Sequence, residues 1–387
     1  MSSILDTYAR KPISFTKGKG SYLYTEKGDK YVDWVAGISA NILGHCHLHV
    51  VKAIQDQSKK LIHVSNAFII KEAESLAKRL TDNTFADKVF FCNSGAESVE
   101  GSIKIVRKYF HTIGKPEKNR IISMSGAFHG RTLAALFLAN NKSHTEGFAP
   151  KVEGFDQVAF ADHEGLKKAI NKNTAAIIVE PIQGEGGIRV LPDYCLKGLR
   201  EICDNHGILL VLDCVQTSFR TGSLLGFENS GIFPDICCVA KGFGNGFPIG
   251  AILLTNEVSI GMSHGSHGST FGNNLLACAA AHAVLDIVLA QGFFEEVKVK
   301  GEYFDKELRK LKDDFPKIIE EVRGINFIKG LKLKVDTNDF MSKLMKNKLL
   351  VVKAAENCIR LFPSLLSTTD ELDIGIKIIK KTCEEMS

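Results

Sequence analysis

Two residues at the ends of apolar runs suggest a site for covalent chemistry. Lys241 follows the run 236–240, and Asp213 follows the run 208–212. If these runs are neighbouring strands, the amine and the carboxylate lie side by side at one edge of a sheet. A lysine can form a Schiff base with the aldehyde of pyridoxal 5'-phosphate, and a carboxylate can pair with the pyridine nitrogen so that the ring accepts electrons. The pair predicts a site for this cofactor, although each residue alone also fits a solvated loop lysine or a helix cap.

A second candidate site is the turn 93–97, which reads Asn-Ser-Gly-Ala-Glu. It follows the apolar run 89–91 and precedes an amphipathic segment that reaches Tyr109. A helix that begins at such a turn directs free backbone N–H groups and the positive end of its dipole toward an anion, so the turn predicts a phosphate site. Ser94 and Glu97 also fit an ordinary capping box, which is compatible with a phosphate site. The glycine fingerprints of dinucleotide sites and P-loops do not occur in the sequence.

Short apolar runs alternate with helix-compatible segments through the middle of the chain. The runs are 89–91, 121–124, 175–179, 208–212 and 236–240, and the amphipathic segments include 97–109 and 193–205. Continuous apolar strands between amphipathic helices predict an α/β fold with a mainly parallel sheet covered on both faces. The polar groups that follow these runs are the turn 93–97, the segment 128–131, Glu180, Asp213 and Lys241. Because ligands bind at the carboxyl ends of parallel strands, we expect one shared site.

The composition changes from Gly292 onward, where segments rich in lysine and glutamate begin. The later helical segments are 293–315 and 368–387, and the strand-like pieces between them lie around 330–333 and 358–361. We therefore expect three parts. They are an N-terminal segment (1–50) that packs with the small domain, a large cofactor-binding domain (51–280) and a small α+β C-terminal domain (281–387).

The 387 residues are 44% hydrophobic and 24% charged, with a formal net charge of +5, which is typical of an ordinary globular protein. Acidic residues are spread among the basic ones, so neither a nucleic-acid surface nor a membrane surface is predicted. Apolar runs fall short of the roughly 18 residues that a membrane helix needs, and the first eight residues lack the apolar region of a signal peptide. The ten cysteines are scattered without a C-x-x-C pair, which favours a reducing compartment. We expect a cytoplasmic protein.

The segment 45–49 holds three histidines and a cysteine, the densest group of metal-type ligands in the chain. Tetrahedral zinc sites need ligands that converge on one centre, and adjacent residues in a tight turn rarely do so without further ligands elsewhere. His264 and His267 lie in a loop rich in glycine and serine, and the same argument applies to them. We therefore expect no metal site.

The ordered motifs resemble the class III (subgroup II) pyridoxal phosphate-dependent aminotransferases, from about Tyr8 to the C-terminal helix. The segments that carry the resemblance are 44–47, 93–97, 128–132, 180–187, 213–217, 241–242, 246–250 and 267–272. The resemblance implies a fold-type I transferase, with a large domain built on a mainly parallel seven-stranded sheet and a smaller α+β domain. It also implies a homodimer. Within the family, the residues are most similar to those of enzymes that act on N2-acetylornithine.

The resemblance further implies a role for each matching residue at the cofactor. The cofactor-binding residues would be Ser94, Gly95, Ala96, Phe128, Asp213, Gln216, Lys241 and, from the partner subunit of the homodimer, Thr270. The turn 94–96 and Thr270 would hold the phosphate, and Phe128 would stack on the pyridine ring. Asp213 would pair with the ring nitrogen, and Gln216 would bond the ring hydroxyl. Lys241 would attach the cofactor and carry the proton between substrate and cofactor, so Lys241 and Asp213 would be catalytic.

Two arginines would bind the substrates, according to the same resemblance. Arg131, with Ser269 nearby, would grip the carboxylate far from the reacting amine, and Arg360 would grip the α-carboxylate of glutamate or 2-oxoglutarate. Glu185 would cover Arg360 when the other substrate, which has no carboxylate at its reacting carbon, is bound. A planar guanidinium suits both tasks because its donors match the two oxygens of a carboxylate.

The implied reaction moves the terminal amino group of N2-acetylornithine to 2-oxoglutarate, giving N-acetylglutamate 5-semialdehyde and glutamate in arginine biosynthesis. N-succinyl-diaminopimelate, ornithine and other ω-amino donors share the arginine grip, although Ile38 disfavours ornithine because ornithine enzymes tend to carry tyrosine at that turn. A mutase or racemase has less need of the switchable clamp formed by Arg360 and Glu185. A non-enzymatic binding protein has no need of Lys241 and Asp213 together.

The chain departs from the family pattern behind the cofactor. The segment 213–222 has Cys214 where relatives have glutamate, has Ser218 where they have glycine, and is one residue shorter. The segment 272–275 reads Gly-Asn-Asn-Leu in place of Gly-Gly-Asn-Pro, next to Thr270. We expect an active enzyme that is slower or less stable than its relatives, with Cys214 buried and inert.

Overall fold

The structure is a computed structural model that describes residues 3–387, so the first two residues of the expected N-terminal segment lie outside it. Seven strands form the central sheet, in the order β4 (Lys88–Cys92), β12 (Gly250–Leu254), β11 (Ile236–Val239), β10 (Leu209–Asp213), β7 (Thr174–Val179), β5 (Arg120–Met124) and β6 (Phe155–Val158). β12 is antiparallel to both of its neighbours, and the other neighbouring strands are parallel. All strands except β12 therefore end at the same edge. The predicted α/β fold with a mainly parallel sheet is confirmed.

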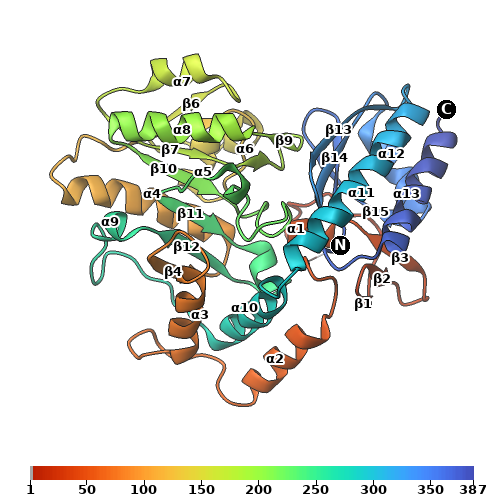
Figure 1. Cartoon of the computed structure of the whole chain (residues 1–387), viewed down its shortest axis with the longest axis horizontal. Coiled ribbons are helices and arrows are strands. Elements are labelled where there is room, and N and C mark those ends of the chain that lie inside the picture. The colour runs from red at the N-terminus through yellow and green to blue at the C-terminus, as the bar shows by residue number, and fades with distance from the viewer. Residues whose placement is uncertain (1–2) are drawn as a thin grey trace.

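Helices cover both faces of this sheet (Figure 1). One face packs against α4 (Gly95–Thr112) and α5 (Leu133–Ala139), and the other against α3 (Lys71–Thr81), α8 (Asp193–His206) and α10 (Leu275–Val288). β7, β10 and β11 are buried along their whole length, and successive residues such as Ile177 and Ile178 point into different cores. A strand that is buried on both faces needs apolar residues at every position, which explains the continuous apolar runs.

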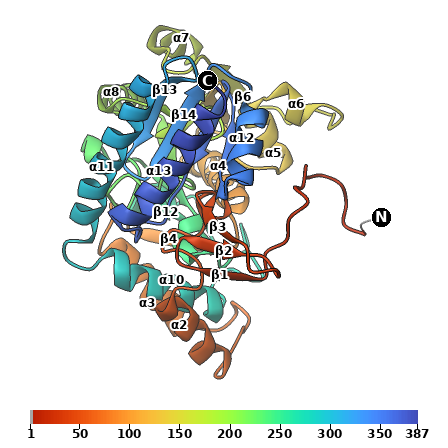
Figure 2. The same cartoon turned by 90° about the vertical axis from the view of Figure 1, so that its right-hand side faces the viewer.

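The C-terminal part contains a second sheet, covered by three long helices (Figure 2). Its antiparallel strands are, in order, β13 (Ile319–Ile325), β14 (Ile328–Leu333), β17 (Cys358–Leu361) and β16 (Val352–Ala354). The helices are α11 (Phe293–Asp314), α12 (Thr337–Lys346) and α13 (Thr369–Glu384). Thr368 and Glu371 form a full capping box at the start of α13, so a capping signal fixes where this helix begins.

A small third sheet joins the two ends of the chain. It contains β1 (Lys17–Lys19), β2 (Tyr22–Tyr24), β3 (Lys30–Asp33) and β15 (Leu349–Leu350). β15 pairs with β3 in parallel, so the N-terminal segment is hydrogen-bonded to the C-terminal part. The division into residues 1–50, 51–280 and 281–387 stays a proposal, and its boundary at residue 280 falls inside α10.

The remaining elements are α2 (Leu48–Ser58), which is as long as α3, and several short pieces. The short pieces are α1 (Ala36–Ser39), α6 (Lys142–Thr145), α7 (His163–Ala169), α9 (Asn256–Ser259), β8 (Ile182–Gln183), β9 (Arg189–Val190) and the 3-10 turns η1 (Glu228–Ser230) and η2 (Lys241–Gly244). Among residues 3–387, no single helix has both the length and the apolar composition for crossing a membrane. The pair α10 and α11, bent by 72°, meets that test together, and most of α10 is buried against the rest of the chain.

Candidate active site

Lys241 and Asp213 lie at the carboxyl ends of adjacent parallel strands. In the register of β10 and β11, Asp213 is paired with Cys238, three residues before Lys241. Lys241 opens η2 with a φ of 49°, a left-handed conformation that few residues other than glycine adopt. Both residues line a cavity of about 210 Å³. The two strands are therefore neighbours, as the apolar runs suggested.

The cavity brings together predicted residues that follow five strands. Those that line it are Gly95, Ala96, Phe128, Arg131, Glu185, Asp213, Gln216 and Lys241. Ser94 caps the helix that begins at Gly95, and Arg360 reaches Glu185 and Gln216 from β17. Ser269 and Thr270 are not among the described residues that line the cavity.

Asp213 is buried, and both of its carboxylate oxygens accept hydrogen bonds. Nδ1 of His129 donates to Oδ2 at 2.8 Å, and the backbone N–H of Val215 donates to Oδ1 at 3.1 Å. Burial by itself would lower the pKa of His129, but the hydrogen bond and charge of Asp213, with the charge of Glu180, raise this pKa overall. His129 therefore holds the carboxylate in one orientation beside the cavity. The motif 128–131 contained His129, but nothing in the sequence paired it with Asp213.

Glu180, directly after β7, is a second buried carboxylate at this edge. It accepts the backbone N–H of Phe128 at 2.9 Å and that of Gly184 at 3.4 Å. Burial raises the pKa of Glu180 to about 7, although the charge of His129 opposes the shift. The two hydrogen bonds fix the segment that carries Phe128 and the loop that carries Glu185. Sequence analysis placed Glu180 at the site but gave it no role.

Burial makes the charged form of the Lys241 amine less favourable than it is in water. Burial lowers the pKa of Lys241 and the charge of Arg360 lowers it further, while the charge of Asp213 raises it. A neutral amine is the nucleophilic form, so the cavity prepares Lys241 to react with an aldehyde.

The turn 93–97 forms the N-terminus of α4. Oγ of Ser94 accepts the backbone N–H of Glu97 at 3.2 Å, and the Glu97 side chain accepts the backbone N–H of Asn93 at 2.6 Å. A Cβ on Gly95 would lie 2.6 Å from Val215, so only glycine lets the helix begin this close to the segment that carries Gln216. The free N–H groups of the first helical turn face the cavity edge formed by Gly95 and Ala96.

The two predicted substrate arginines differ in environment. Arg360 is buried, and its guanidinium bonds Glu185 at 2.7 Å, the carbonyl of Lys353 at 2.8 Å and Oε1 of Gln216 at 3.4 Å. Arg131 is exposed at the cavity mouth, 5.4 Å from the ring centre of Phe128.

His144 adds a contact at the mouth that sequence reasoning missed. Its Nε2 lies 3.2 Å from Nη2 of Arg131, and its ring packs edge-on against Phe128. Burial lowers the pKa of His144, and the charge of Arg131 lowers it further. The sequence gave no signal for this residue because α6 lies outside the family motifs.

These residues fit pyridoxal phosphate on three observations. Nε2 of His129 and Nε of Arg360 are buried without a hydrogen-bond partner among residues 3–387, so polar groups remain available beside the cavity. The cavity places one primary amine next to one carboxylate, the donor set that the cofactor needs. Gly95 and Ala96 line the cavity at the start of α4, the end of a helix that favours an anion such as a phosphate.

Two of the three histidines of segment 45–49 pair with separate carboxylates. Nε2 of His45 bonds Asp33 at 2.7 Å, and Nε2 of His49 bonds Asp286 at 2.7 Å. Within the described part of the chain, no group of three or more histidine, cysteine, aspartate or glutamate side chains is arranged to hold a metal ion.

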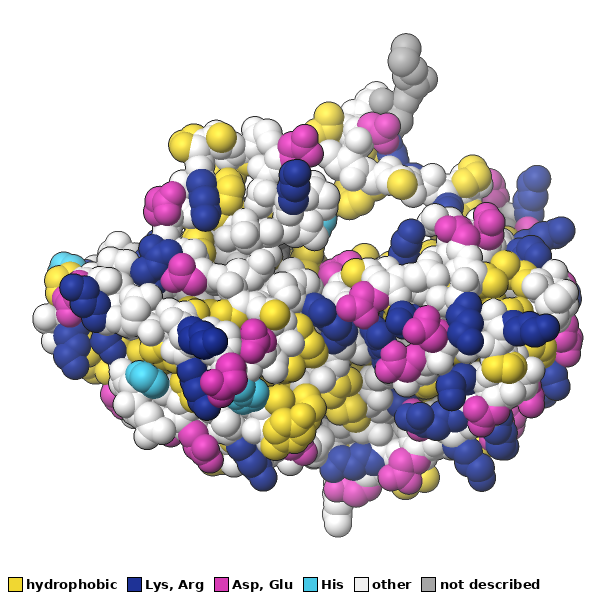
Figure 3. All heavy atoms as spheres, turned by 90° about the horizontal axis from the view of Figure 1, so that it is seen from above, with side chains coloured by type: hydrophobic (Ala, Val, Ile, Leu, Met, Phe, Trp, Pro, Cys, Tyr) yellow, Lys and Arg dark blue, Asp and Glu magenta, His cyan; other side chains and the backbone are white. Residues whose placement is uncertain are grey.

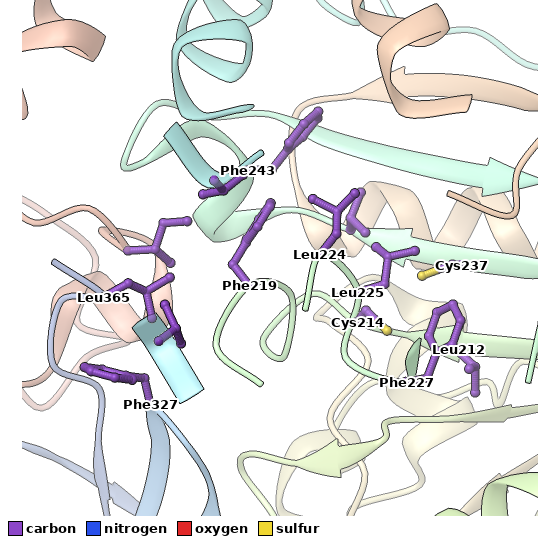
Figure 4. Close-up of a cluster of buried hydrophobic side chains, with 14 of the residues drawn as sticks. Leu212, Cys214, Phe219, Leu224, Leu225, Phe227, Cys237, Phe243, Phe327 and Leu365 are labelled. Carbon is purple, nitrogen blue, oxygen red and sulfur yellow. The ribbon is translucent and has the colours of Figure 1, made fainter. Parts of the chain in front are cut away.

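The departures from the family pattern are absorbed by the core and by left-handed turns. Cys214 is fully buried in a cluster that includes Leu212, Phe227 and Cys237 (Figure 4). Phe219 also packs in this cluster and has a φ of 70°, in the segment that is one residue short. Asn273 has a φ of 67°, and asparagine tolerates this conformation better than most residues other than glycine.

Comparison with known proteins identifies the family. Residues 6–383 match the family described as Aminotransferase class-III. The chain belongs to the class III aminotransferases. It is 48% identical to an acetylornithine aminotransferase of Agrobacterium fabrum, over 99% of this chain and 96% of that protein. It is also 40% identical to an acetylornithine aminotransferase of Clostridium acetobutylicum, over 98% of this chain and 99% of that protein.

Solved structures of class III aminotransferases have the same fold. The ornithine aminotransferase of Toxoplasma gondii has a TM-score of 0.95 at 30% identity, covering 99% of this chain and 93% of that chain. The acetylornithine aminotransferase of Elizabethkingia anophelis has a TM-score of 0.88 at 31% identity, covering 98% of this chain and 96% of that chain. The protein is therefore a pyridoxal phosphate-dependent aminotransferase, and its substrates are amino acids and 2-oxo acids.

Proposed function

We propose that this aminotransferase moves the terminal amino group of N2-acetylornithine to 2-oxoglutarate, giving N-acetylglutamate 5-semialdehyde and glutamate in arginine biosynthesis. Relatives with 45% to 48% identity over nearly the whole chain are named acetylornithine aminotransferases. The observation in the structure that carries the proposal is the ion pair of Glu185 with Arg360, beside the cavity that Arg131 also lines.

Two arginines and one glutamate suit a pair of unequal substrates. Glutamate and 2-oxoglutarate have a carboxylate at each end, so each needs both Arg131 and Arg360. N2-acetylornithine has one carboxylate, which Arg131 binds, and its reacting carbon carries none. We call Glu185 and its ion pair with Arg360 the Glu185 gate. The gate is closed when the acylated donor is bound and opens when a second carboxylate displaces Glu185.

The cofactor supplies an aldehyde that takes up the amino group and a ring that accepts electrons from the reacting carbon. Lys241 attaches the cofactor and then holds a proton at Nζ, which it moves between the substrate carbon and the cofactor. Asp213, oriented by His129, keeps a proton on the ring nitrogen. Phe128 would stack on the ring, and Gln216 would bond the ring hydroxyl.

Ser94, Gly95 and Ala96, where α4 begins, would hold the phosphate group. We propose that Thr270 reaches the same phosphate from the partner subunit of a homodimer. Thr270 is exposed, as is the neighbouring Phe271. The hydroxyl of Ser269 accepts a hydrogen bond from Asn93 of its own chain at 3.1 Å, which anchors the segment that carries Thr270. We propose that Ser269 also lies near Arg131.

A patch of exposed apolar side chains supports the dimer. Phe68, Ile69 and Phe271 are 66%, 83% and 58% exposed. Asn66 donates to the carbonyls of Ser269 at 2.8 Å and of Gly272 at 3.1 Å, so the two segments form one surface. Large exposed apolar residues on one surface mark a contact with another chain.

We also propose a cytoplasmic location. All ten cysteines are free thiols, and nine of them are buried, which suits a reducing compartment. On the face shown in Figure 3, basic and acidic side chains are interspersed.

The second candidate donor is ornithine, because the Toxoplasma gondii structure with a TM-score of 0.95 is named an ornithine aminotransferase. Ile38 favours a donor whose second amine is acylated. It is next to Ser39, whose hydroxyl donates to the carbonyl of Gln216 at 3.1 Å. A free ammonium beside an isoleucine would lose its hydrogen bonds to water without gaining a hydrogen-bond partner from the protein. The test is a coupled assay with 2-oxoglutarate and a donor panel of N2-acetylornithine, N-succinyl-diaminopimelate, ornithine and other ω-amino acids. A higher kcat/KM for ornithine than for N2-acetylornithine would overturn the proposal.

A further inference from the structure

The loop 184–188, which carries Glu185, is held by the hairpin that also carries Arg360. The hairpin consists of β16, the turn 355–357 and β17. The backbone N–H of Ala355 donates to the carbonyl of Glu185 at 2.9 Å. The side chain of Glu185 meets Arg360 on β17 at 2.7 Å. Both the backbone and the side chain of Glu185 are therefore tied to one hairpin.

Glu356, in the turn of this hairpin, joins two arginines that flank the loop. Its Oε2 lies 2.6 Å from Nη1 of Arg323, and its Oε1 lies 3.4 Å from Nη1 of Arg189. The same Nη1 of Arg323 donates to the carbonyl of Gly187 at 3.0 Å. The Glu356 carboxylate thus connects β9, the loop 184–188 and β13.

Arg189 anchors the other side of the loop. Its Nη2 donates to the carbonyl of Ser125 at 2.6 Å, and its guanidinium also bonds the Gln183 side chain just before the loop. The loop is closely packed, because a Cβ on Gly187 would lie 3.1 Å from the carbonyl oxygen of Ala355. Glu356 itself has a φ of 56°, so its side chain is directed at the arginines from a left-handed turn.

We propose that Glu356 is a positioning residue that holds the Glu185 gate closed over Arg360, and so sets the preference between monocarboxylate donors and dicarboxylate substrates. The inference rests on the proposed role of the Glu185 gate. Without the Glu356 carboxylate, the turn of the hairpin loses its ion pairs with Arg189 and Arg323, the two arginines that hold the loop at Gln183 and Gly187. Arg360 is then free for a larger fraction of the time, and the apparent affinity for a second carboxylate rises with that fraction.

The experiment measures equilibrium binding to the holoenzyme by calorimetry. The probes are glutarate, an unreactive dicarboxylate that needs Arg360, and N-acetylglycine, a monocarboxylate that does not. In Glu356→Gln, glutarate should bind about two- to fivefold more tightly, the range expected when a partly exposed ion pair is lost, and N-acetylglycine should bind as in wild type. The ratio of kcat/KM for glutamate to that for N2-acetylornithine should rise by a similar factor.

Glu321→Gln is the matched control. Glu321 pairs with Nε of the same Arg323 at 2.7 Å, so this variant removes one carboxylate from Arg323 without touching Arg189 or the loop. It should bind glutarate as wild type does. If Glu356→Gln and Glu321→Gln change glutarate binding equally, Glu356 has no special hold on the gate and the inference is wrong.

Glu185→Gln separates this inference from the function on which it rests. This variant should tighten glutarate binding, and adding Glu356→Gln to it should cause no further change, because Glu356 acts through Glu185. Independent, additive effects would overturn the inference and leave the gate intact. No effect of Glu185→Gln on glutarate binding would overturn the gate itself, and the inference with it.

Discussion

At the scale of single residues, the site combines buried charges that control one another. Asp213 is oriented by His129, and Glu180 lies close enough to influence the pKa of both His129 and Lys241. Arg360 lowers the pKa of Lys241 further, and Glu185 partly offsets that effect. Changes to individual residues should therefore alter distinct steps.

Lys241→Ala should abolish catalysis and still allow the cofactor to bind without a covalent bond, because the phosphate turn and Asp213 remain. The wild-type protein should be yellow, and borohydride should fix the cofactor to the peptide that contains Lys241. Peptide mapping by mass spectrometry checks this assignment. A label on another lysine would contradict it.

Arg360→Ala should mainly damage the half-reaction with glutamate and 2-oxoglutarate, whereas Arg131→Ala should damage both half-reactions. Each loss of a charge-assisted contact should cost about 2 to 4 kcal/mol in kcat/KM for the affected substrate. Single-turnover measurements with each substrate separate the two cases. Equal losses in both half-reactions for Arg360→Ala would count against the gate.

Glu180 should make stability depend on pH. Its pKa rises from 4.5 to about 7 because of burial, so between these values the folded protein holds a proton that the unfolded chain has released. The free energy of unfolding of wild type, relative to Glu180→Gln, should therefore fall as pH rises from about 4.5 to about 7, by roughly 1 to 3 kcal/mol. Denaturant unfolding at several pH values measures this difference. Glu164→Gln, at an exposed site, should show no such trend.

At the scale of elements, the site depends on where strands end and on what packs behind them. Asp213 is the last residue of β10, and Cys214 turns into the core beside Leu212 and Cys237. After the strand, Ser218 donates to the carbonyl of Cys214 at 2.7 Å and Phe219 adopts a positive φ. Cys214 and Ser218, which depart from the family pattern, and Phe219 in the shortened segment therefore lie behind the face of the site that would meet the cofactor.

Asp213→Ala should slow the reaction by several orders of magnitude, because the ring nitrogen loses the group that keeps it protonated, while cofactor attachment at Lys241 persists. Asp213→Glu should keep some activity.

Cys214→Ser should change the rate less than roughly tenfold, about 1.4 kcal/mol. Cys214→Glu should not improve the enzyme, because a carboxylate would enter a pocket packed around a thiol. Rates and Tm values of the four variants check these expectations. Loss of turnover in Cys214→Ser as complete as in Asp213→Ala would give the thiol a catalytic role.

At the scale of the whole molecule, the proposed dimer should show whether Thr270 acts across the interface. A hybrid of one Lys241→Ala subunit and one Thr270→Ala subunit contains one intact site only if Thr270 serves the partner. That hybrid should have about half the activity of wild type and a wild-type cofactor affinity at its active site. Differently tagged subunits allow it to be purified. If Thr270 serves its own subunit, the hybrid should have no site with the affinity of wild type.

Much of the α/β framework could be predicted from the sequence. The runs that end at Asp213 and Lys241 are fully apolar because β10 and β11 are buried on both faces, and such runs identify themselves. The start of α4 was also predictable, since Ser94 caps the helix through a local hydrogen bond. β12 is also buried along its whole length, yet it was not predicted as a strand, and its antiparallel place between β11 and β4 depends on packing between distant segments.

The sequence by itself determined the residue types of the site, because a lysine, an aspartate and a small-residue turn follow local signals for strand ends and helix starts. Tertiary structure decided their partners. His129 and Asp213 are 84 positions apart in the sequence, and Arg360 and Gln216 are 144 positions apart. Contacts between such distant residues produce no periodic pattern in the sequence. The link of Glu356 to Arg189 depends in addition on how the hairpin of β16 and β17 packs on the loop 184–188. Local chemistry fixes which groups are present, and packing between distant segments fixes which charges face one another.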